Sequence, residues 1–132
     1  MTEWRPKNKG FIAEGTVYGK CAVVWGTNPV KQAKVPTGAT LIIGVVQGAA
    51  REVFATLSVI DVAIEGIVEM CTTAAVITAG QLVYVDTAGR ATAQGSGAAT
   101  QYCIGVAQST SGSTLDNLVE VLLVPTVLVV HA

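Results

Sequence analysis

The hydrophobic residues of this chain occur in short runs and not in a helical repeat. Short runs rich in Val, Ile and Thr are separated by Gly and small polar residues, and no window of 11 or more residues shows a helical period. Val (21) and Thr (15) supply 36 of the 132 residues, and both favour strands. We predict strands at residues 19–25, 40–46, 53–60, 62–69, 81–86, 90–93, 102–107, 117–124 and 126–130.

This spacing of short strands predicts an all-β fold, a small β-sandwich or barrel of short antiparallel strands with an extended N-terminal arm. One hairpin is well marked: alternating Leu82, Tyr84 and Asp86 lead into a turn in which Gly89 can adopt a positive φ. Residues 1–34 carry six bases and two acids, whereas residues 35–132 carry two bases and seven acids. We therefore expect a basic arm with a first strand in residues 1–34 and one β-domain in residues 35–132; the arm either reaches an acidic neighbour or is solvated.

The phrase Ile-Gly-Val-x-Gln occurs twice, with Gly44 and Gly105 lying 61 positions apart. Each copy is followed by a loop and another predicted strand. A glycine inside a strand often marks a bulge or a close backbone contact. Because Gln47 and Gln108 are neutral amides, the repeat favours two related hairpins of one scaffold over a duplicated binding site.

Few residues of the chain are suited to chemistry. The only histidine is His131, and no phosphate-binding loop or catalytic triad is present. One face of the strand predicted at 62–69 and the residue before it would carry three acids, because Asp61, Glu65 and Glu69 lie an even number of positions apart. They form either a cation site or a solvated or partner-facing stripe. The alternating apolar residues between them favour the stripe. We expect no cofactor and no bound metal.

The composition indicates either an unusually apolar surface or a surface that partners largely cover, and the second arrangement is the more stable one. Hydrophobic residues make up 51% of the chain and charged residues 13%, which suggests that partners cover apolar surface. The net charge of −1 and the scarcity of aromatic residues argue against nucleic acid as a partner. A membrane helix is also not expected, because the apolar run at 118–130 is too short and is interrupted by Glu120 and Pro125. Three unpaired cysteines, Cys21, Cys71 and Cys103, indicate a reducing compartment.

Several phrases occur in an order typical of one family: "TLIIGVVQ", "VAIEGIVEM", "AGQLVYVDTAGRATAQ" and "YCIGVAQSTSGSTLDNLVEVLLV". Over residues 36–124 the chain resembles the capsid cement, or decoration, proteins of tailed bacteriophages. The resemblance implies a non-enzymatic β-fold in the virion, made in the host cytoplasm and bound to the outer face of the capsid. The implied partners are the major capsid protein and other copies of the chain, as a homotrimer or a dimer.

Residues 1–34 and 125–132 lie outside the resembling region. In the first of these segments we expect Trp4, Arg5, Lys7, Lys9 and Phe11 to contact the capsid or another subunit, since aromatic residues beside basic ones are frequent at interfaces. Two alternatives remain. One is a carbohydrate- or host-binding module, although loops 95–100 and 109–117 contain no aromatic residue. The other is an enzyme with an acidic site in a subunit cleft.

Overall fold

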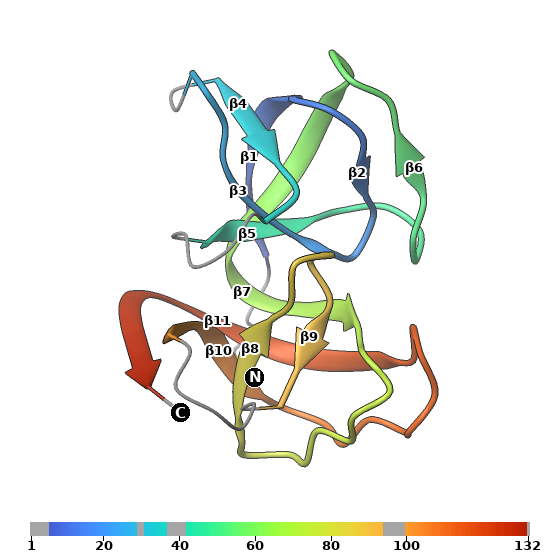
Figure 1. Ribbon diagram of the computed structural model, residues 1–132, viewed down its shortest axis with the longest axis vertical. Helices are drawn as coiled ribbons and strands as arrows, with labels where there is room; N and C mark the ends of the chain where they lie inside the picture. Colours follow the sequence, from blue (N-terminus) through green and yellow to red (C-terminus); the bar gives the residue numbers. More distant parts are fainter. Residues whose placement is uncertain (1–5, 29–30, 37–41, 94–99, 132) are drawn as a thin grey trace.

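The computed structural model describes residues 6–28, 31–36, 42–93 and 100–131 (Figure 1). Within these ranges the chain forms eleven strands and no helix, which confirms the all-β prediction; no described helix is long and apolar enough to cross a membrane. The strands are β1 (Lys7–Ala13), β2 (Val17–Tyr18), β3 (Ala22–Trp25), β4 (Gln32–Lys34), β5 (Ile42–Val46), β6 (Val53–Phe54), β7 (Val59–Cys71), β8 (Leu82–Val85), β9 (Ala91–Thr92), β10 (Thr100–Ala107) and β11 (Leu118–His131).

The first half of the chain forms a small closed barrel, the upper part of the molecule in Figure 1. Its strands follow the order β1-β4-β3-β5-β7, and β7 pairs back with β1 to close the ring. β1 is antiparallel to β7, with Phe11 opposite Ile60, and parallel to β4, with Ala13 opposite Ala33. The other neighbours are antiparallel. A separate two-stranded ladder, β2–β6, lies beside the barrel.

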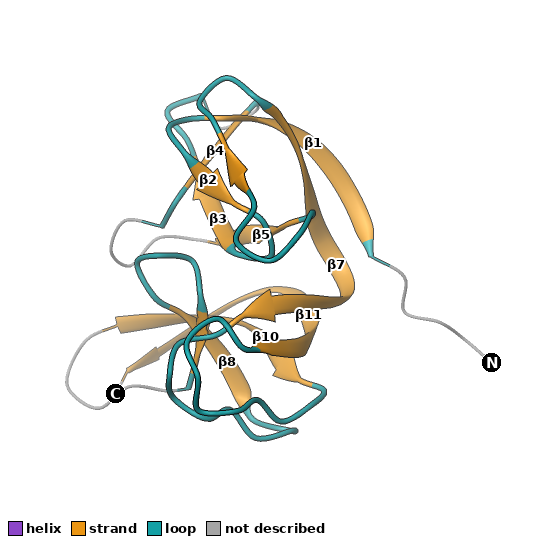
Figure 2. Ribbon diagram, turned by 90° about the vertical axis from the view of Figure 1, so that its right-hand side faces the viewer, coloured by secondary structure: helices purple, strands orange, loops and turns teal. Residues whose placement is uncertain are grey.

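The second half repeats this arrangement below the first, in the order β7-β11-β10-β8-β9. It is closed by one parallel bridge, Thr72 to Ala91, and by the Thr73 N–H, which donates to the Ala91 carbonyl at 3.0 Å. The long strand β7 belongs to both halves. Its residues up to Glu65 pair with β1 or β5, and from Gly66 onward it pairs with β11. Figure 2 shows β7 passing from one half into the other.

Backbone hydrogen bonds show that the two halves are copies of one design. The Lys20 N–H donates to the Val46 carbonyl at 2.7 Å, and the Gly80 N–H donates to the Ala107 carbonyl at 2.8 Å. The two donors are 60 positions apart in the sequence, and the two acceptors are 61 positions apart. The order of the strands is also the same in both halves, including the parallel contact that closes each half. The chain is therefore a tandem pair of five-stranded units that share β7.

The repeated phrase occupies corresponding strands, β5 and β10. A Cβ on Gly44 would collide with the Ala63 carbonyl oxygen, and a Cβ on Gly105 would collide with the Leu122 carbonyl oxygen. The ladder is irregular beside each glycine. This confirms the predicted close backbone contact: two strands approach there more closely than any side chain permits.

The two glutamines that end the phrase also correspond. The Gln47 N–H donates to the Asp61 carbonyl at 2.8 Å, and the Gln108 N–H donates to the Glu120 carbonyl at 2.7 Å. The second copy is the predicted hairpin, β10–β11. In the first copy the prediction is wrong in one respect, because β5 pairs with β7 and not with a strand that begins at Val53.

Several predicted strand boundaries also need correction. The strands predicted at 53–60 and 62–69 are instead the two-residue β6 and the 13-residue β7, separated by a turn at residues 55–58. The strands predicted at 117–124 and 126–130 are one strand, β11, which passes through Pro125. The β10–β11 ladder is irregular between Leu123 and Leu128, and a proline is tolerated at such an irregularity because no ladder N–H is needed there.

The N-terminal part of the chain is more ordered than the sequence indicates. Residues 7–34 contribute β1 to β4 where one strand was expected, and β3 pairs with β5 across the expected division at residue 34. Residues 7–13 were expected to belong to the extended arm, but they form β1, a strand of the first barrel. Residues 1–5 lie outside the described residues.

Each half has its own hydrophobic core at corresponding positions. The first core consists of Phe11, Ala13, Val17, Val23, Ala33, Val46, Ile60 and Val62. Their counterparts in the second half are Met70, Thr72, Ile77, Val83, Ala91, Ala107, Val119 and Val121, all buried. The second cluster also takes in Ala22, Val45 and Ala63, so it extends to the first barrel and joins the two halves.

Candidate interaction surface

The basic residues predicted to bind a partner lie at the start of β1. Lys7 and Lys9 are exposed, and the Lys7 ammonium is 3.7 Å from a carboxylate oxygen of Glu65 on β7. Because both side chains of this ion pair are exposed, the pair contributes little to stability, and Lys7 is available to another carboxylate. Trp4 and Arg5 lie outside the described residues.

Phe11 occupies a different position from the one its predicted role requires. Its side chain is only 2% exposed and lies in the core of the first barrel. The Trp25 ring meets it edge to face, with centroids 5.8 Å apart, and the Lys9 ammonium lies 5.5 Å from the centre of the Phe11 ring. Trp25 is 41% exposed, so the aromatic surface beside the basic strand comes from Trp25 on β3.

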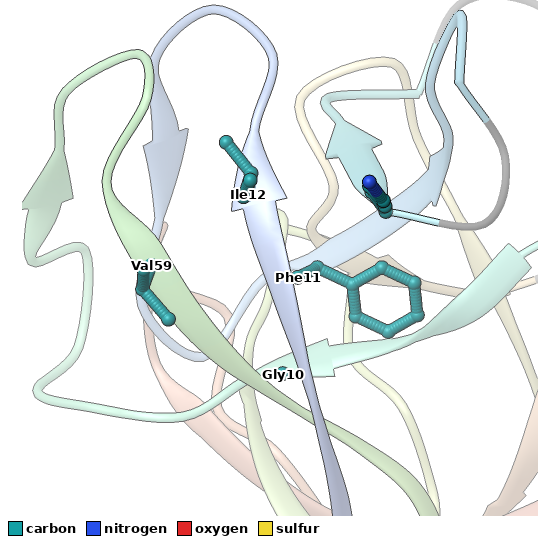
Figure 3. A pocket seen from close by; sticks show the side chains of 5 residues that line it. Gly10, Phe11, Ile12 and Val59 are labelled. Carbon is teal, nitrogen blue, oxygen red and sulfur yellow. The ribbon is translucent and has the colours of Figure 1, made fainter.

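A shallow pocket of about 320 Å³ lies beside this strand (Figure 3). It is lined by Gly10, Phe11, Ile12, Lys31 and Val59. In the close view, Ile12 and Val59 stand on the neighbouring strands β1 and β7, where they are opposite each other in the ladder. The lining is apolar apart from Lys31, so the pocket can take up an apolar group, and its described lining has no second titratable group to act with this lysine.

The three acids of β7 do not converge. Glu65 pairs with Lys7, Glu69 pairs with Lys20 at 3.3 Å, and Asp61 is exposed near the start of the strand. Among the described residues, no group of three His, Cys, Asp or Glu side chains could hold a metal ion. These carboxylates therefore form a surface stripe that is partly neutralised by lysines.

The described cysteines are free, and two of them are buried. Burial raises the pKa of Cys71 to about 11, and it also raises the pKa of Cys103. Arg51 donates a hydrogen bond to the Cys21 sulfur at 3.3 Å, and its guanidinium stacks 3.9 Å from the centre of the Tyr18 ring. The buried thiol of Cys71 is therefore a packing group and not a nucleophile.

The predicted hairpin at residues 82–93 is confirmed as β8–β9. One carboxylate oxygen of Asp86 accepts the N–H groups of Ala88 and Arg90, both at 2.9 Å, and Gly89 has a φ of 84°. The Ala22 N–H donates to the Gly89 carbonyl at 2.7 Å, so the tip of this hairpin docks on the first barrel. The role of Gly89 is therefore structural.

Large apolar side chains are exposed at separate places on both halves. Several lie near the starts of β7 and β11, and others lie along the strands; the more exposed ones are Trp25, Val53, Leu57, Val59, Val76, Leu82, Leu115, Leu118 and Val124. Sequence reasoning did not single out these residues. Because a β-strand exposes every second residue, their exposure follows only from the register and from the positions of the turns.

The described residues thus combine a tandem β-fold with basic residues at the start of β1 and exposed apolar side chains. The sequence model of the phage cement protein family matches residues 22–123, most of the chain. The chain therefore belongs to the phage cement protein family, as its resemblance implied, and it is a structural protein associated with the phage capsid. No curated protein sequence matches it.

A solved structure supports the fold assignment. The chain is similar to the N base of the head fiber gp8.5 of bacteriophage phi29, with a TM-score of 0.64 over 94% of this chain and 98% of that one. Only 11% of the aligned residues are identical, so the similarity shows a shared fold.

Proposed function

We propose that this protein binds the outer face of a phage head and stabilises the contacts between neighbouring capsomers. The observation that carries the proposal is the cement-family match over residues 22–123. The surface is consistent with it, because exposed apolar and basic side chains are present without a catalytic constellation among the described residues. The proposed partner is the major capsid protein.

Self-association is part of the proposal. A homotrimer is the assembly we favour, with a dimer as the alternative. A specific protein contact buries about 1,200–2,000 Å² in total. Many copies on one shell add up modest contacts of this kind into strong overall attachment. The free cysteines are in accord with synthesis in the host cytoplasm.

The proposed capsid or subunit contacts include the basic start of the chain, with Trp4, Arg5, Lys7 and Lys9 reaching the partner directly. In this proposal Phe11 acts from the core, where its ring holds Trp25 in place and lies beneath Lys9. The lysines would pair with carboxylates of the shell, and such pairs mainly set orientation and the rate of association.

Adding the purified protein to heads assembled without it tests the attachment. Cryo-electron microscopy should then show ordered density on the outside of the shell and none inside. Heads that remain bare at micromolar protein concentrations would refute the proposed function.

Charge substitutions test the basic strand. The variant Lys7→Gln/Lys9→Gln should associate with heads more slowly and with a weaker dependence on salt than the wild type. Lys20→Gln is a matched control, since Lys20 also pairs with a glutamate of β7. Equal association rates for the double variant and the control would contradict the assignment of Lys7 and Lys9.

A further inference from the structure

The two halves present the same turn at corresponding places. In the first half, the Ser58 N–H donates to the Ala55 carbonyl at 3.1 Å, just before β7; in the second, the Asn117 N–H donates to the Thr114 carbonyl at 3.2 Å, just before β11. We call these the β7 turn (residues 55–58) and the β11 turn (residues 114–117).

Each turn is fastened to its barrel by the same pair of hydrogen bonds. The Leu57 N–H donates to the Ala13 carbonyl at 2.8 Å, and the Ala13 N–H donates to the Ser58 carbonyl at 2.9 Å. In the second half, Asp116 and Asn117 make the same bonds with Thr72, at 2.7 Å and 2.9 Å. The chain therefore holds both turns in one defined conformation.

Both turns expose apolar side chains. Leu57 is 75% exposed and Val59, at the start of β7, is 77% exposed. In the β11 turn Leu115 is 54% exposed, and Leu118, at the start of β11, is 36% exposed. Val59 and Leu118 occupy corresponding positions, whereas Leu57 corresponds to Asp116 and Leu115 to Thr56. Each turn thus exposes two apolar side chains, although only one of the two is at the same position in both halves.

Folding does not account for a leucine at position 57. Its φ is 70°, in the left-handed region where a leucine costs roughly 1–2 kcal/mol and Gly, Asn or Asp is preferred. The corresponding Asp116 has a φ of 62° and suits this conformation, and its carboxylate accepts a hydrogen bond from Arg90 at 2.6 Å. Leu57 instead projects into solvent, so a contact with a partner accounts for it better than a role in the fold.

The size of the turns indicates what covers them. Full burial of a Val or Leu side chain is worth about 1.5–3 kcal/mol at ~25 cal/mol per Å², which corresponds to roughly 60–120 Å². Two such side chains provide about 200 Å², a small part of the ~800 Å² per partner that a stable pair of proteins buries. One turn alone is therefore too small to hold two free copies of the chain together.

A shell of repeated subunits is a partner for which two small contacts suffice. Any depression on the surface of one shell subunit is repeated many times over the shell, and once one turn is bound the other meets a second site at a high effective concentration. β7 begins at the top of the upper barrel in Figure 1, whereas β11 begins at the right of the lower one, so the two contacts fall at separate points.

We propose that each chain binds the head shell at two points, with Leu57 and Val59 of the β7 turn and Leu115 and Leu118 of the β11 turn each entering an apolar depression on the outer shell surface. This inference rests on the proposed attachment to the head. It adds that the tandem design makes one chain bivalent, so that a single molecule bridges two shell sites.

One substitution in each turn tests the inference with little risk to the fold. Leu57→Asn introduces a residue that tolerates a positive φ, and Leu115→Thr gives the β11 turn the residue of the β7 turn at that place, Thr56. Leu82→Ser, at a 40% exposed leucine of β8 outside both turns, is the matched control. Affinity is measured by co-sedimentation with heads assembled without the protein, and folding by thermal melts.

We expect each turn variant to bind heads at least about tenfold more weakly than the wild type, and the double variant to lose roughly the product of the two effects. The melting temperature of Leu57→Asn should match or exceed that of the wild type, so its loss of binding would not reflect unfolding. Leu82→Ser should bind like the wild type.

Several results would overturn the inference. If the wild type binds and the double variant binds equally well, two-point binding is wrong while the proposed function stands. A control that weakens as much as the turn variants would also refute it. A double variant that loses self-association by light scattering, with unchanged binding per chain, would assign the turns to another copy. If the wild type does not bind heads, both proposals fail.

Discussion

Replacing either repeated glycine by alanine should destabilise the fold strongly and to a similar extent. A Cβ at Gly44 would meet the Ala63 carbonyl oxygen, and one at Gly105 would meet the Leu122 carbonyl oxygen. Both obstacles are backbone atoms of a paired strand, so neither can rotate away as a side chain would. Gly10 is the matched control, because it also lies in a strand but a Cβ there would have no neighbour within 4 Å.

The size of the effect follows from overpacking. Extra atoms in a packed region typically cost about 1–3 kcal/mol, and a backbone collision belongs at the upper end of that range. With about 2.1 cal/mol/K per residue for the unfolding entropy, a chain of 132 residues has an unfolding entropy of roughly 0.28 kcal/mol/K. A loss of about 3 kcal/mol should therefore lower the melting temperature by roughly 10 °C, which is large against a typical stability of about 5–15 kcal/mol.

Thermal unfolding followed by circular dichroism, with urea titration as a second probe, measures this effect. We expect Gly44→Ala and Gly105→Ala to melt roughly 10 °C below the wild type, and Gly10→Ala to melt within about 2 °C of it. If either repeated glycine accepts alanine as easily as Gly10 does, the strands do not approach as closely as described. A large effect at only one of the two would contradict their equivalence.

Three further substitutions or reactions test single contacts. Asp86→Ala removes the acceptor of two backbone N–H groups, so urea denaturation should show that the free energy of unfolding falls by about 1–2 kcal/mol. Asp61→Ala, at an exposed residue, should leave it unchanged, and equal effects of the two substitutions would refute the role of Asp86. Thr72→Val replaces a buried hydroxyl that has no hydrogen-bond partner among the described residues and should raise the free energy of unfolding by about 1 kcal/mol; a lower denaturation midpoint would contradict this. Cys71, with its pKa raised to about 11, stays protonated at pH 8. Mass spectrometry should therefore find that iodoacetamide alkylates Cys71 far more slowly in the native protein than in the urea-unfolded protein, and equal rates would count against its burial.

Local patterns predicted the features that depend on neighbours in sequence. The hairpin at residues 82–93 was predicted because Asp86 and Gly89 determine a turn within four residues. The close contacts at Gly44 and Gly105 were predicted because a glycine inside a valine-rich strand usually marks a bulge or the close approach of another backbone. These features need no knowledge of the tertiary fold.

β1 was missed because its pairing is long-range. Its first residues are polar and include Gly10, so the segment reads as a flexible arm. It becomes a strand by pairing with β7, where Lys9 lies opposite Val62, and with β4. Phe11 was misjudged for the same reason, since a single aromatic residue after a basic run looks like an exposed anchor until a barrel closes around it.

The tandem design was only partly visible. The sequence repeats one phrase of five residues, whereas the structure repeats strand order, turns and core positions. Corresponding positions have diverged, as with Ala13 and Thr72 or Leu57 and Asp116. Backbone hydrogen bonds survive such changes because they do not depend on side-chain identity, so the duplication is clear in the structure and faint in the sequence.

Some of the candidate contact residues could be predicted from local sequence, and others could be identified only from the structure. The basic character of Lys7 and Lys9 could be predicted from sequence, and both are exposed in the structure. The apolar pairs at the β7 and β11 turns could not be predicted, because their significance comes from the equivalence of the two turns that carry them. Of the four residues, only Val59 and Leu118 are apolar at corresponding positions, 59 apart in the sequence.

Heat-induced release of DNA from filled heads tests the central claim most directly. Heads assembled without the protein are divided, one portion is saturated with purified protein, and both are warmed with a dye that reports free DNA. If the protein cements the shell, the saturated heads should release DNA at a clearly higher temperature, and adding the Leu57→Asn/Leu115→Thr variant at the same concentration should not raise it. Identical release temperatures for saturated and bare heads would contradict the stabilising role.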